Sequence, residues 1–554
     1  MNLKRLFIYS GTDEKIDFSI TETPERADKN EGINEYIKNS IKDKENQVYK
    51  TGKVSKDIKE NLAFVKDAFE SPKNFDLMIR EFKVKMGSRG IDAFLIFYDG
   101  LANKEFINRD ILNPLMVSGI DQNAEDDAIE DIVCRRMISQ APNKKIQEMK
   151  MVIELVEFGN CAVFVDGCPS AFVADVKGWA GRSVGKPITE STLAGPQEAF
   201  NETVLTNVAL IRKILKDSNL VAENIPVGSR SKTPCAIMYI SGLTNYSLVE
   251  AIRNRLKNID VEYIFSSTDI EMLIEDSALF PLPQILKTER PDRAASMLAD
   301  GKVVIIVQGS PFVLVLPATA PDLIEAAEDN YVRVTEANFM RFVRVMGIFL
   351  ATFLPGIFIG IALYHHESIP TDLLFAVEAT REKMPFPIVL ELVIMILAFE
   401  LIKEASIRVP DPIGSTLGIV GGLILGQSAV EANIASPLLI IIVSISALGS
   451  FAAPSLALSR AISVIQFIFV VSGAIAGFLG LAFSVFISAL YLSATEMLGV
   501  PYLSSTAFKS ENRVSGGTII HPIWKREKRP FDLKPQAENK QPHISRKWRE
   551  KENK

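Results

Sequence analysis

The chain has 554 residues, a formal net charge of −6, four cysteines and four histidines, and its mean hydropathy is +0.16 although 23% of its residues are charged. One hydrophobic core rarely extends past about 250–300 residues, so this length indicates several structural units. The positive mean hydropathy argues against a purely soluble protein, because an ordinary charge fraction beside it requires an apolar block elsewhere in the chain.

The first 60 residues are charged and poor in large apolar side chains, which predicts a flexible arm. Lys4 and Arg5 precede only four apolar residues, too few for the core of a signal peptide. The soluble half of the chain is therefore expected to stay on the cytoplasmic side of a membrane.

Cysteine and histidine are too sparse in the N-terminal half for most catalytic or metal sites. The cysteines contain no Cys-x-x-Cys pair, and the first histidine of the chain is His365. This distribution excludes a Ser-His-Asp triad, a Cys-His pair and a histidine-based metal site from residues 1–364. No G-x-x-x-x-G-K-[ST] phosphate loop occurs. These absences are evidence against an enzyme, although carboxylate chemistry stays open, and we predict neither a cofactor nor a metal site.

The soluble half contains an internal repeat with an offset of 142 residues. An apolar run leads into Gly-Leu-x-Asn twice, and a later apolar run leads into Gly-x-Pro twice. The paired positions are Gly100, Leu101 and Asn103 with Gly242, Leu243 and Asn245, then Gly159, Gly167 and Pro169 with Gly301, Gly309 and Pro311. Each copy predicts a strand, helices and then a hairpin that turns at its Gly-x-Pro.

These copies predict two related α/β subdomains, at residues 61–180 and 220–320, with a helical connector from Glu198 to Lys216 between them. Two interpretations of the pair stay open. The copies are either packing modules with a structural role, or the two lobes of a binding unit whose cleft lies between them.

The apolar block at residues 345–508 carries only 5 basic and 10 acidic side chains, and it predicts a helical membrane domain of four to six spans. Residues 345–364 contain no charge and are long enough to cross about 30 Å of hydrocarbon. Further apolar runs follow at residues 386–404, 412–426 and 437–451. Residues 461–492 are too long for one straight span and fit two tightly turned ones.

Glycine recurs at every fourth position of one apolar run, at Gly414, Gly418, Gly422 and Gly426. On a helix these residues form a stripe that lets another backbone approach closely. The stripe is either a surface for close helix packing or one face of a pore or gate.

Four polar residues of the block are pore or gate candidates, namely Glu391, Gln427, Glu431 and Asn433. An ionisable group at bilayer depth costs roughly 2.5–3.5 kcal/mol on insertion scales, so it usually faces water or a polar partner. Acidic side chains in such positions line cation-selective pores. Glu391 is the stronger candidate because apolar residues bracket it, whereas Glu431 also fits a short external loop.

The tail at residues 509–554 carries 13 basic and 6 acidic side chains. Because these basic residues gather beside the apolar block, we predict contact with membrane lipid and no nucleic-acid partner. A cytoplasmic tail and a cytoplasmic start together require an even number of spans.

Several long motifs of the chain carry a family resemblance. They are GNCAVFVDGCP from Gly159, GPQEAFNETVLTNVALIRK from Gly195, TERPDRAASML from Thr288, and FPIVLELVIMILAFELIKEASIRVPDPIGSTLGIVGGLILG from Phe386. These motifs resemble the GerA family of spore germination proteins, A-subunit type. The resemblance covers residues from about Asp67 to Thr506 and leaves out the arm and the basic tail.

The resemblance implies a subunit of a nutrient germinant receptor in the inner membrane of bacterial spores. It implies a B-type transporter-like subunit and a C-type lipoprotein subunit as partners, and homo-oligomers formed through the membrane domain. It also implies that the chain forms or gates an ion channel, crossing the membrane several times with its N-terminal domain and C-terminal tail in the cytoplasm. The alternatives are a secondary transporter of a small nutrient or ion, and a membrane-anchored scaffold without conduction.

The predicted fold is thus an α/β soluble domain of two related subdomains, followed by an α-helical polytopic membrane domain. The predicted parts are a charged flexible arm at 1–60, a first α/β subdomain with the connector at 61–219, a second at 220–340, the membrane domain at 341–508 and the cytoplasmic tail at 509–554.

Overall fold

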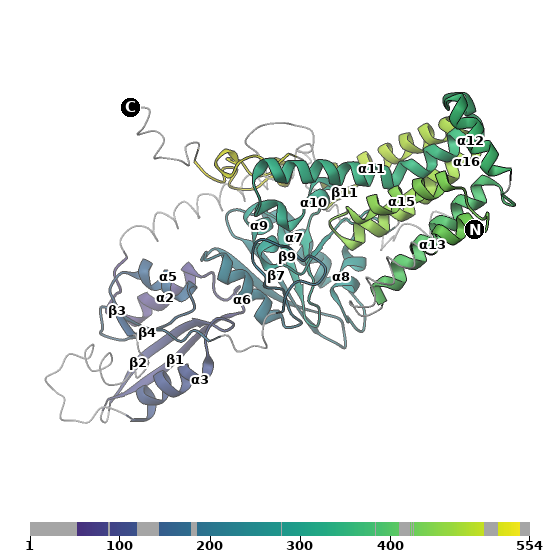
Figure 1. Cartoon of the computed structure of the whole chain (residues 1–554). Coiled ribbons are helices and arrows are strands. Elements are labelled where there is room, and N and C mark those ends of the chain that lie inside the picture. The colour runs from purple at the N-terminus through teal and green to yellow at the C-terminus, as the bar shows by residue number, and fades with distance from the viewer. Residues whose placement is uncertain are drawn as a thin grey trace.

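The computed structural model describes most of the chain between residues 52 and 542 (Figure 1). The described residues are 52–86, 89–118, 143–178, 185–278, 280–382, 384–408, 422, 424, 426–503 and 519–542. Most of the predicted arm at residues 1–60 lies outside them, as do Gly414 and Gly418 of the glycine stripe.

An antiparallel sheet of five strands, in the order β1-β2-β4-β5-β3, forms the first unit. The strands are β1 (Leu77–Met86), β2 (Arg89–Tyr98), β3 (Asn143–Ile146), β4 (Cys161–Val165) and β5 (Ala171–Ala174). Because successive side chains of a strand point to opposite faces, the apolar strands bury both faces of the sheet. Helices α2 (Ile58–Ala68) and α5 (Met149–Glu157) cover one face, and the helical residues that begin with α3 (Lys104–Phe106) cover the other.

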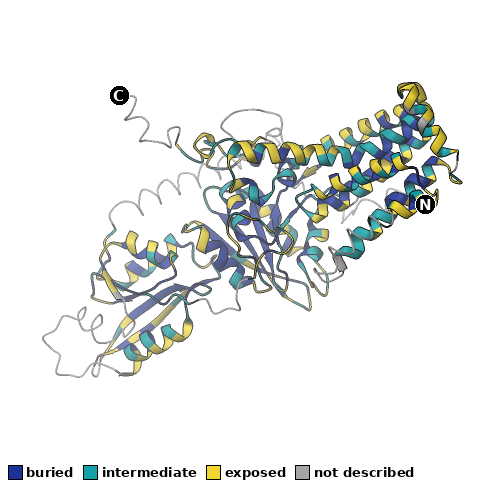
Figure 2. Ribbon diagram, in the orientation of Figure 1, coloured by how far each residue is buried: buried dark blue, intermediate teal, exposed yellow. Residues whose placement is uncertain are grey.

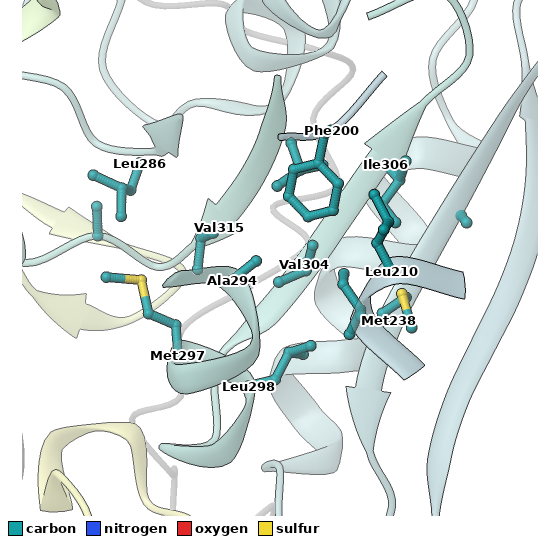
Figure 3. Packing of buried hydrophobic residues seen from close by; sticks show 14 of the residues in the cluster. Phe200, Leu210, Met238, Leu286, Ala294, Met297, Leu298, Val304, Ile306 and Val315 are labelled. Carbon is teal, nitrogen blue, oxygen red and sulfur yellow. The ribbon is translucent and has the colours of Figure 1, made fainter. Parts of the chain in front are cut away.

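A second antiparallel sheet of five strands, in the order β6-β7-β9-β10-β8, forms the second unit. The strands are β6 (Leu220–Val227), β7 (Thr233–Ile240), β8 (Leu286–Thr288), β9 (Val303–Val307) and β10 (Val313–Leu316). Helices α7 (Tyr246–Lys257) and α8 (Ser267–Ile274) cover one face, and α6 (Val204–Ile214) and α9 (Pro291–Ala299) cover the other. Figure 3 shows this last layer, with Leu210 of α6 and Leu298 of α9 facing Val304 and Ile306 of β9.

The second sheet repeats the first with the offset predicted from the sequence. Equivalent cross-strand pairs differ by 142 positions, as in Ala93–Val165 with Cys235–Val307, and Cys161–Ala174 with Val303–Leu316. The predicted duplication is therefore confirmed in strand order and in register.

The described helices after residue 333 form an elongated bundle that extends away from the sheets (Figure 1). They are α11 (Val334–Tyr364), α12 (Thr371–Arg381), α13 (Ile388–Arg408), α15 (Pro437–Phe451) and α16 (Leu456–Ala494). Among the described residues, α11 and α16 are the two helices long and apolar enough to cross a membrane, and α15 is a shorter apolar helix. The number of spans, four to six, stays a prediction.

Helix α16 consists of two helices joined by a sharp reversal. Ala476 and Gly477 have non-helical backbone angles, and Gly477 has φ 57° and ψ −138°, a conformation available chiefly to glycine. In a straight helix, residues 472 and 480 would lie about 12 Å apart along the axis. Here they are in contact, because a Cβ atom on Gly480 would collide with the carbonyl oxygen of Ser472, so the chain folds back on itself. The predicted turn within residues 461–492 is confirmed, and that each half spans a membrane stays a prediction.

The sheets and the bundle differ in what they expose. Figure 2 shows buried residues concentrated in the two sheets and exposed residues along the outside of the bundle. Leu401, Ile475 and Leu479 of the bundle are each exposed by at least 70%. Large apolar surfaces of this kind mark contacts with lipid or with another protein.

Candidate functional site

Glu391 lies in the first turn of α13 and is the most deeply buried pore or gate candidate, with 1% of its surface exposed. Within the described residues, neither of its carboxylate oxygens has a hydrogen bond of good geometry. The polar groups near it are the Arg381 guanidinium and the backbone of Ser436, the N-cap residue of α15. Glu391 thus faces the interior of the bundle, and its role in a pore stays a prediction.

The other three polar candidates lie on the surface at the end of a helix. Gln427 donates from Nε2 to Oε1 of Glu431 at 3.1 Å, and both side chains are exposed. Asn433 is exposed in the turn that follows and has φ 53°. The structure therefore does not bring these side chains to the buried position of Glu391. Glu431 is the last helical residue before a turn, and both interpretations of this residue stay predictions.

Among the glycines that the structure describes, close helix contacts lie at positions outside the predicted stripe. A Cβ atom on Gly473 of α16 would lie 2.6 Å from the carbonyl oxygen of Gly356 in α11. A Cβ atom on Gly449 of α15 would collide with the carbonyl oxygen of Gly347 in α11. These glycines are the positions where another backbone requires the absence of a side chain.

The predicted stripe makes no comparable contact in the part of the chain that the structure describes. A Cβ atom on Gly422 would meet nothing within 4 Å, and one on Gly426 would meet only Ile440, at 3.8 Å. Gly414 and Gly418 lie outside the described residues. The packing or pore role of the stripe stays a prediction.

The repeat anchors are the residues that match between the two copies. Those of the second motif, Gly-x-Pro, form the two hairpin turns. Gly167 and Gly309 have φ 84° and 87°, and Pro169 and Pro311 follow two residues later. A positive φ of this size is strained for any residue with a side chain. These anchors are conformational requirements of the fold, not groups presented to a ligand.

The repeat anchors of the first motif, Gly100 and Gly242, lie where the two units meet. A Cβ atom on Gly100 would lie 2.8 Å from Cβ of Ala209 in α6, so α6 packs directly against the first unit. Gly242 has φ 75° in the turn after β7, and this turn lines a cavity. The cavity lies where the two-lobed interpretation expects a cleft, and the choice between that interpretation and packing modules stays a prediction.

A cavity of about 510 Å³ lies between the two units. Residues 66–73, at the end of α2 and in the turn after it, form one wall, and residues 239–249 of β7 and α7 form another. Gln536 of the C-terminal tail also lines it. The volume is in the range of about 300–1,000 Å³ that small-molecule sites occupy. Of these residues, sequence reasoning singled out only Gly242.

The cavity carries charges of both signs. Lys66 and Lys73 supply positive charge, and Asp67 and Glu70 supply negative charge. Glu70 accepts hydrogen bonds from Ser241 Oγ at 2.6 Å and from Lys73 Nζ at 3.1 Å, so it ties the first unit to the second. Such a mixture suits a small molecule that has both a cationic and an anionic group.

The phenol of Tyr239 on the cavity wall is fixed by a partly buried ion pair. Its hydroxyl donates to Glu223 at 2.6 Å, and Arg253 binds the same carboxylate through two nitrogens at 2.8 and 2.9 Å. Burial raises the pKa of Tyr239, and the bond to Glu223 raises it further. Burial alone would raise the pKa of Glu223, but Arg253 and Tyr239 hold it below its usual value. This wall is therefore rigid and its phenol stays protonated.

Arg212 of α6 anchors the first unit next to the second. Its guanidinium binds Asp76 at 2.6 and 2.9 Å and also donates to the carbonyl oxygen of Leu220 at 2.8 Å. Burial alone would lower the pKa of Arg212, but the Asp76 carboxylate holds it above its usual value. The guanidinium therefore stays charged while it is buried.

Glu157 at the end of α5 is expected to make stability depend on pH. Burial raises its pKa to about 7, the charges of Asp217 and Glu154 add to the rise, and a hydrogen bond with Ser218 opposes it. Since this carboxyl has an ordinary pKa near 4.5 in the unfolded chain, the folded chain binds more protons between about pH 4.5 and 7. Stability therefore falls as pH rises through that window.

Glu157→Gln should remove this part of the pH dependence. Allowing for partial exposure of the side chain, we expect a loss of about 1 kcal/mol between pH 5 and pH 8 in the unaltered chain and a flatter profile in the variant. Thermal unfolding of the two proteins across this range measures the difference. The exposed Glu148→Gln is the control, and an equal flattening in that variant would contradict the assignment to Glu157.

Comparison with known proteins relates the chain to a described family. The family model "Bacillus/Clostridium GerA spore germination protein" matches residues 63–531. "Spore germination protein KA" of Bacillus subtilis (strain 168) is 35% identical over 478 residues, which cover 86% of this chain and 87% of that protein. "Uncharacterized membrane protein YfkQ" of the same organism is 33% identical over 478 residues, which cover 86% of this chain and 91% of that protein. The crystal structure of the N-terminal domain of the A subunit of the Bacillus megaterium spore germinant receptor GerK3 is 28% identical, covers 48% of this chain and 96% of that chain, and has a TM-score of 0.36.

Proposed function

The chain belongs to the GerA family of spore germination proteins, and from this premise we propose that it is the A subunit of a nutrient germinant receptor. The observation that carries the proposal is the match across residues 63–531, which includes both sheets and the helix bundle. In this role the chain acts with a transporter-like B-type subunit and a C-type lipoprotein subunit. Relatives such as "Spore germination protein KA" are named as germination proteins and not as enzymes, which agrees with the histidine-free N-terminal half.

The proposed location is the inner membrane of the spore. The length and hydropathy of α11 and α16 support it, as does the relative named a membrane protein. Arg344 near the start of α11 binds Asp329 at 3.1 Å, and Leu458 and Leu492 near the two ends of α16 pack on the core of the second unit. These segments begin and end on the side of the sheets, which supports an even number of spans with the sheets and the tail in the cytoplasm.

In the proposed mechanism, the membrane domain forms homo-oligomers and gates an ion path that passes Glu391. The carboxylate of Glu391 is buried in the single chain, so opening has to expose it to water or to ions. A ligand drives such a change only if it binds the open arrangement more tightly than the closed one.

Glu391→Gln should reduce cation flux through receptors reconstituted from the full chain and its partner subunits in lipid vesicles. We expect a change of at least roughly tenfold in conductance or cation selectivity, because one charge about 4 Å from an ion is worth about 4 kcal/mol at an effective dielectric constant near 20. Single-channel recording measures it. Glu378→Gln, on the exposed side of α12, is the matched control and should leave the currents unchanged.

The same recordings separate the proposal from its alternatives. Unchanged currents in Glu391→Gln would remove this residue from the ion path. A flux that saturates with one nutrient would favour a secondary transporter, and the absence of any flux would favour a membrane-anchored scaffold.

We propose a second function for the soluble units, the binding of a small zwitterionic molecule in the cavity between them. The paired lysines and carboxylates on its walls support this function, as does the rigid phenol of Tyr239. Because the cavity lies between the two units, a bound ligand would change the contact between them. Such a change would be transmitted to the bundle through the second unit, on which the ends of α16 pack.

A further inference from the structure

The C-terminal tail folds back onto the second unit. Arg529 donates from Nε to the carbonyl oxygen of Ala299 at the end of α9, and Lys540 forms an ion pair of 2.6 Å with Asp300. Leu533 is 2% exposed and belongs to the hydrophobic core of the second unit. Residues 527–540 therefore form a docked loop, held by one apolar anchor and by polar contacts at a helix end.

The docked loop places Gln536 in the lining of the cavity. The backbone N–H of Gln536 donates to the carbonyl oxygen of Leu243 at 2.9 Å, in the turn that also lines the cavity. Pro535 packs on Gly301, where a Cβ atom would lie 3.5 Å from Cβ of Pro535. Leu243 and Gly301 are both repeat anchors, so the loop is seated on conformationally fixed positions.

The side chain of Gln536 has an unused hydrogen-bond acceptor. Its Oε1 atom is buried and has no partner among the described residues. Buried polar atoms in proteins are nearly always paired, and an unpaired one is unfavourable. A small rotation of the side chain would present this oxygen to a donor on a molecule in the cavity.

Gln536 also lies beyond the segment that the family model matches, which ends at residue 531. The other residues that line the cavity fall inside that segment. The tail therefore adds to the cavity a side chain that the family match does not include.

We propose that Gln536 is a specificity-determining residue of the cavity, which binds the ammonium group of a small zwitterionic ligand through Oε1. The ligand's anionic group then pairs with Lys66 or Lys73. This inference rests on the ligand-binding function proposed above for the cavity.

The test measures binding of three probes to the purified full chain by titration calorimetry. L-phenylalanine has an ammonium group, a carboxylate and a ring that fits beside Pro72, Tyr246 and Val249 on the cavity walls. Phenethylamine lacks the carboxylate, and 3-phenylpropionate lacks the ammonium group. The unaltered chain should bind L-phenylalanine more tightly than either analogue.

Gln536→Leu should weaken binding of L-phenylalanine and phenethylamine by roughly five- to tenfold, the usual effect of one lost hydrogen bond, and should leave 3-phenylpropionate unchanged. Gln536→Glu keeps the acceptor and adds a negative charge, so it should raise the affinity for phenethylamine relative to L-phenylalanine. If Gln536 had a purely structural role, its substitution would change the affinities for all three probes by the same factor. Glu538→Gln, exposed in the same loop, is the matched control and should change none of them.

The outcomes separate this inference from the function on which it rests. If the unaltered chain binds none of the probes, the cavity function is wrong and the inference fails with it. If the unaltered chain binds L-phenylalanine and Gln536→Leu weakens all probes equally, or none, the cavity function stands and the role of Gln536 is overturned.

Discussion

Arg212→Leu is expected to lower the free energy of unfolding of the sheet units by about 3–5 kcal/mol, the usual effect of removing one partner from a buried ion pair. Arg212 and Asp76 are each 3% exposed, and their closest approach is 2.6 Å. Without the guanidinium, the Asp76 carboxylate is left buried and uncompensated, and the carbonyl oxygen of Leu220 loses a donor. Thermal unfolding of the full chain in detergent measures the effect.

Three further variants test the cause of this loss. Arg212→Lys keeps the charge but not the two-pronged contact with Asp76, so we expect an intermediate loss. The double variant with both Arg212 and Asp76 changed to leucine should recover part of the stability, because no buried charge is then left alone. Lys213→Ala removes the neighbouring exposed pair with Glu198 and should cost less than about 1 kcal/mol. Equal losses in Arg212→Leu and Lys213→Ala would contradict the argument.

Gly473→Ala is expected to destabilise the helix bundle by about 1–3 kcal/mol, because overpacking forces closely packed helices apart. The new Cβ atom would lie 2.6 Å from the carbonyl oxygen of Gly356 and 3.0 Å from Cγ2 of Ile359. The first neighbour is backbone and cannot rotate away, so α11 and α16 have to separate. The melting temperature of the full chain in detergent and the yield of folded protein measure the effect.

Gly426→Ala is the matched control for the bundle, since its Cβ atom would meet only Ile440 at an ordinary 3.8 Å. Alanine favours a helix over glycine by about 1 kcal/mol, so this variant should be as stable as the unaltered chain or slightly more stable. A loss in Gly426→Ala as large as that in Gly473→Ala would mean that the variants report helix composition and not the α11–α16 contact.

The duplicated fold was predictable because its determinants are local. Gly167 and Gly309 are required at hairpin turns by their positive φ, whatever packs around them. Asn103 and Asn245 each accept a hydrogen bond from the backbone N–H two residues later, at the start of a helix. Signals of this kind recur at a fixed offset when a unit is duplicated, and the confirmed register of the two sheets follows from them.

The ion pair that joins the units was not predictable, because Arg212 and Asp76 are 136 residues apart in sequence. One signal was present. Arg212 follows Val208 by four residues and so lies on the apolar side of the helix, where a solvent-facing charge is not expected. That signal indicates a buried charge and a partner, but the partner's identity depends on how the two sheets lie against each other.

For the helix bundle, the amino-acid sequence was enough to identify the apolar segments and to indicate that the last of them turns, because hydropathy and segment length are local properties. The folded chain shows a close backbone contact that spacing did not indicate, between Gly356 and Gly473. The role of the stripe ending at Gly426 stays a prediction, because Gly414 and Gly418 lie outside the described residues. A glycine stripe permits close approach but does not specify the partner, which depends on the path of every helix in between.

The same division holds for the soluble half. Its sequence determined two copies of one unit and the absence of histidine chemistry, since both follow from residue types at fixed positions. The cavity between the copies, its charges of both signs and the delivery of Gln536 from the tail were decided by tertiary structure. These groups come from α2, from the turn after β7 and from a segment almost 300 residues farther along, and only the folded chain brings them together.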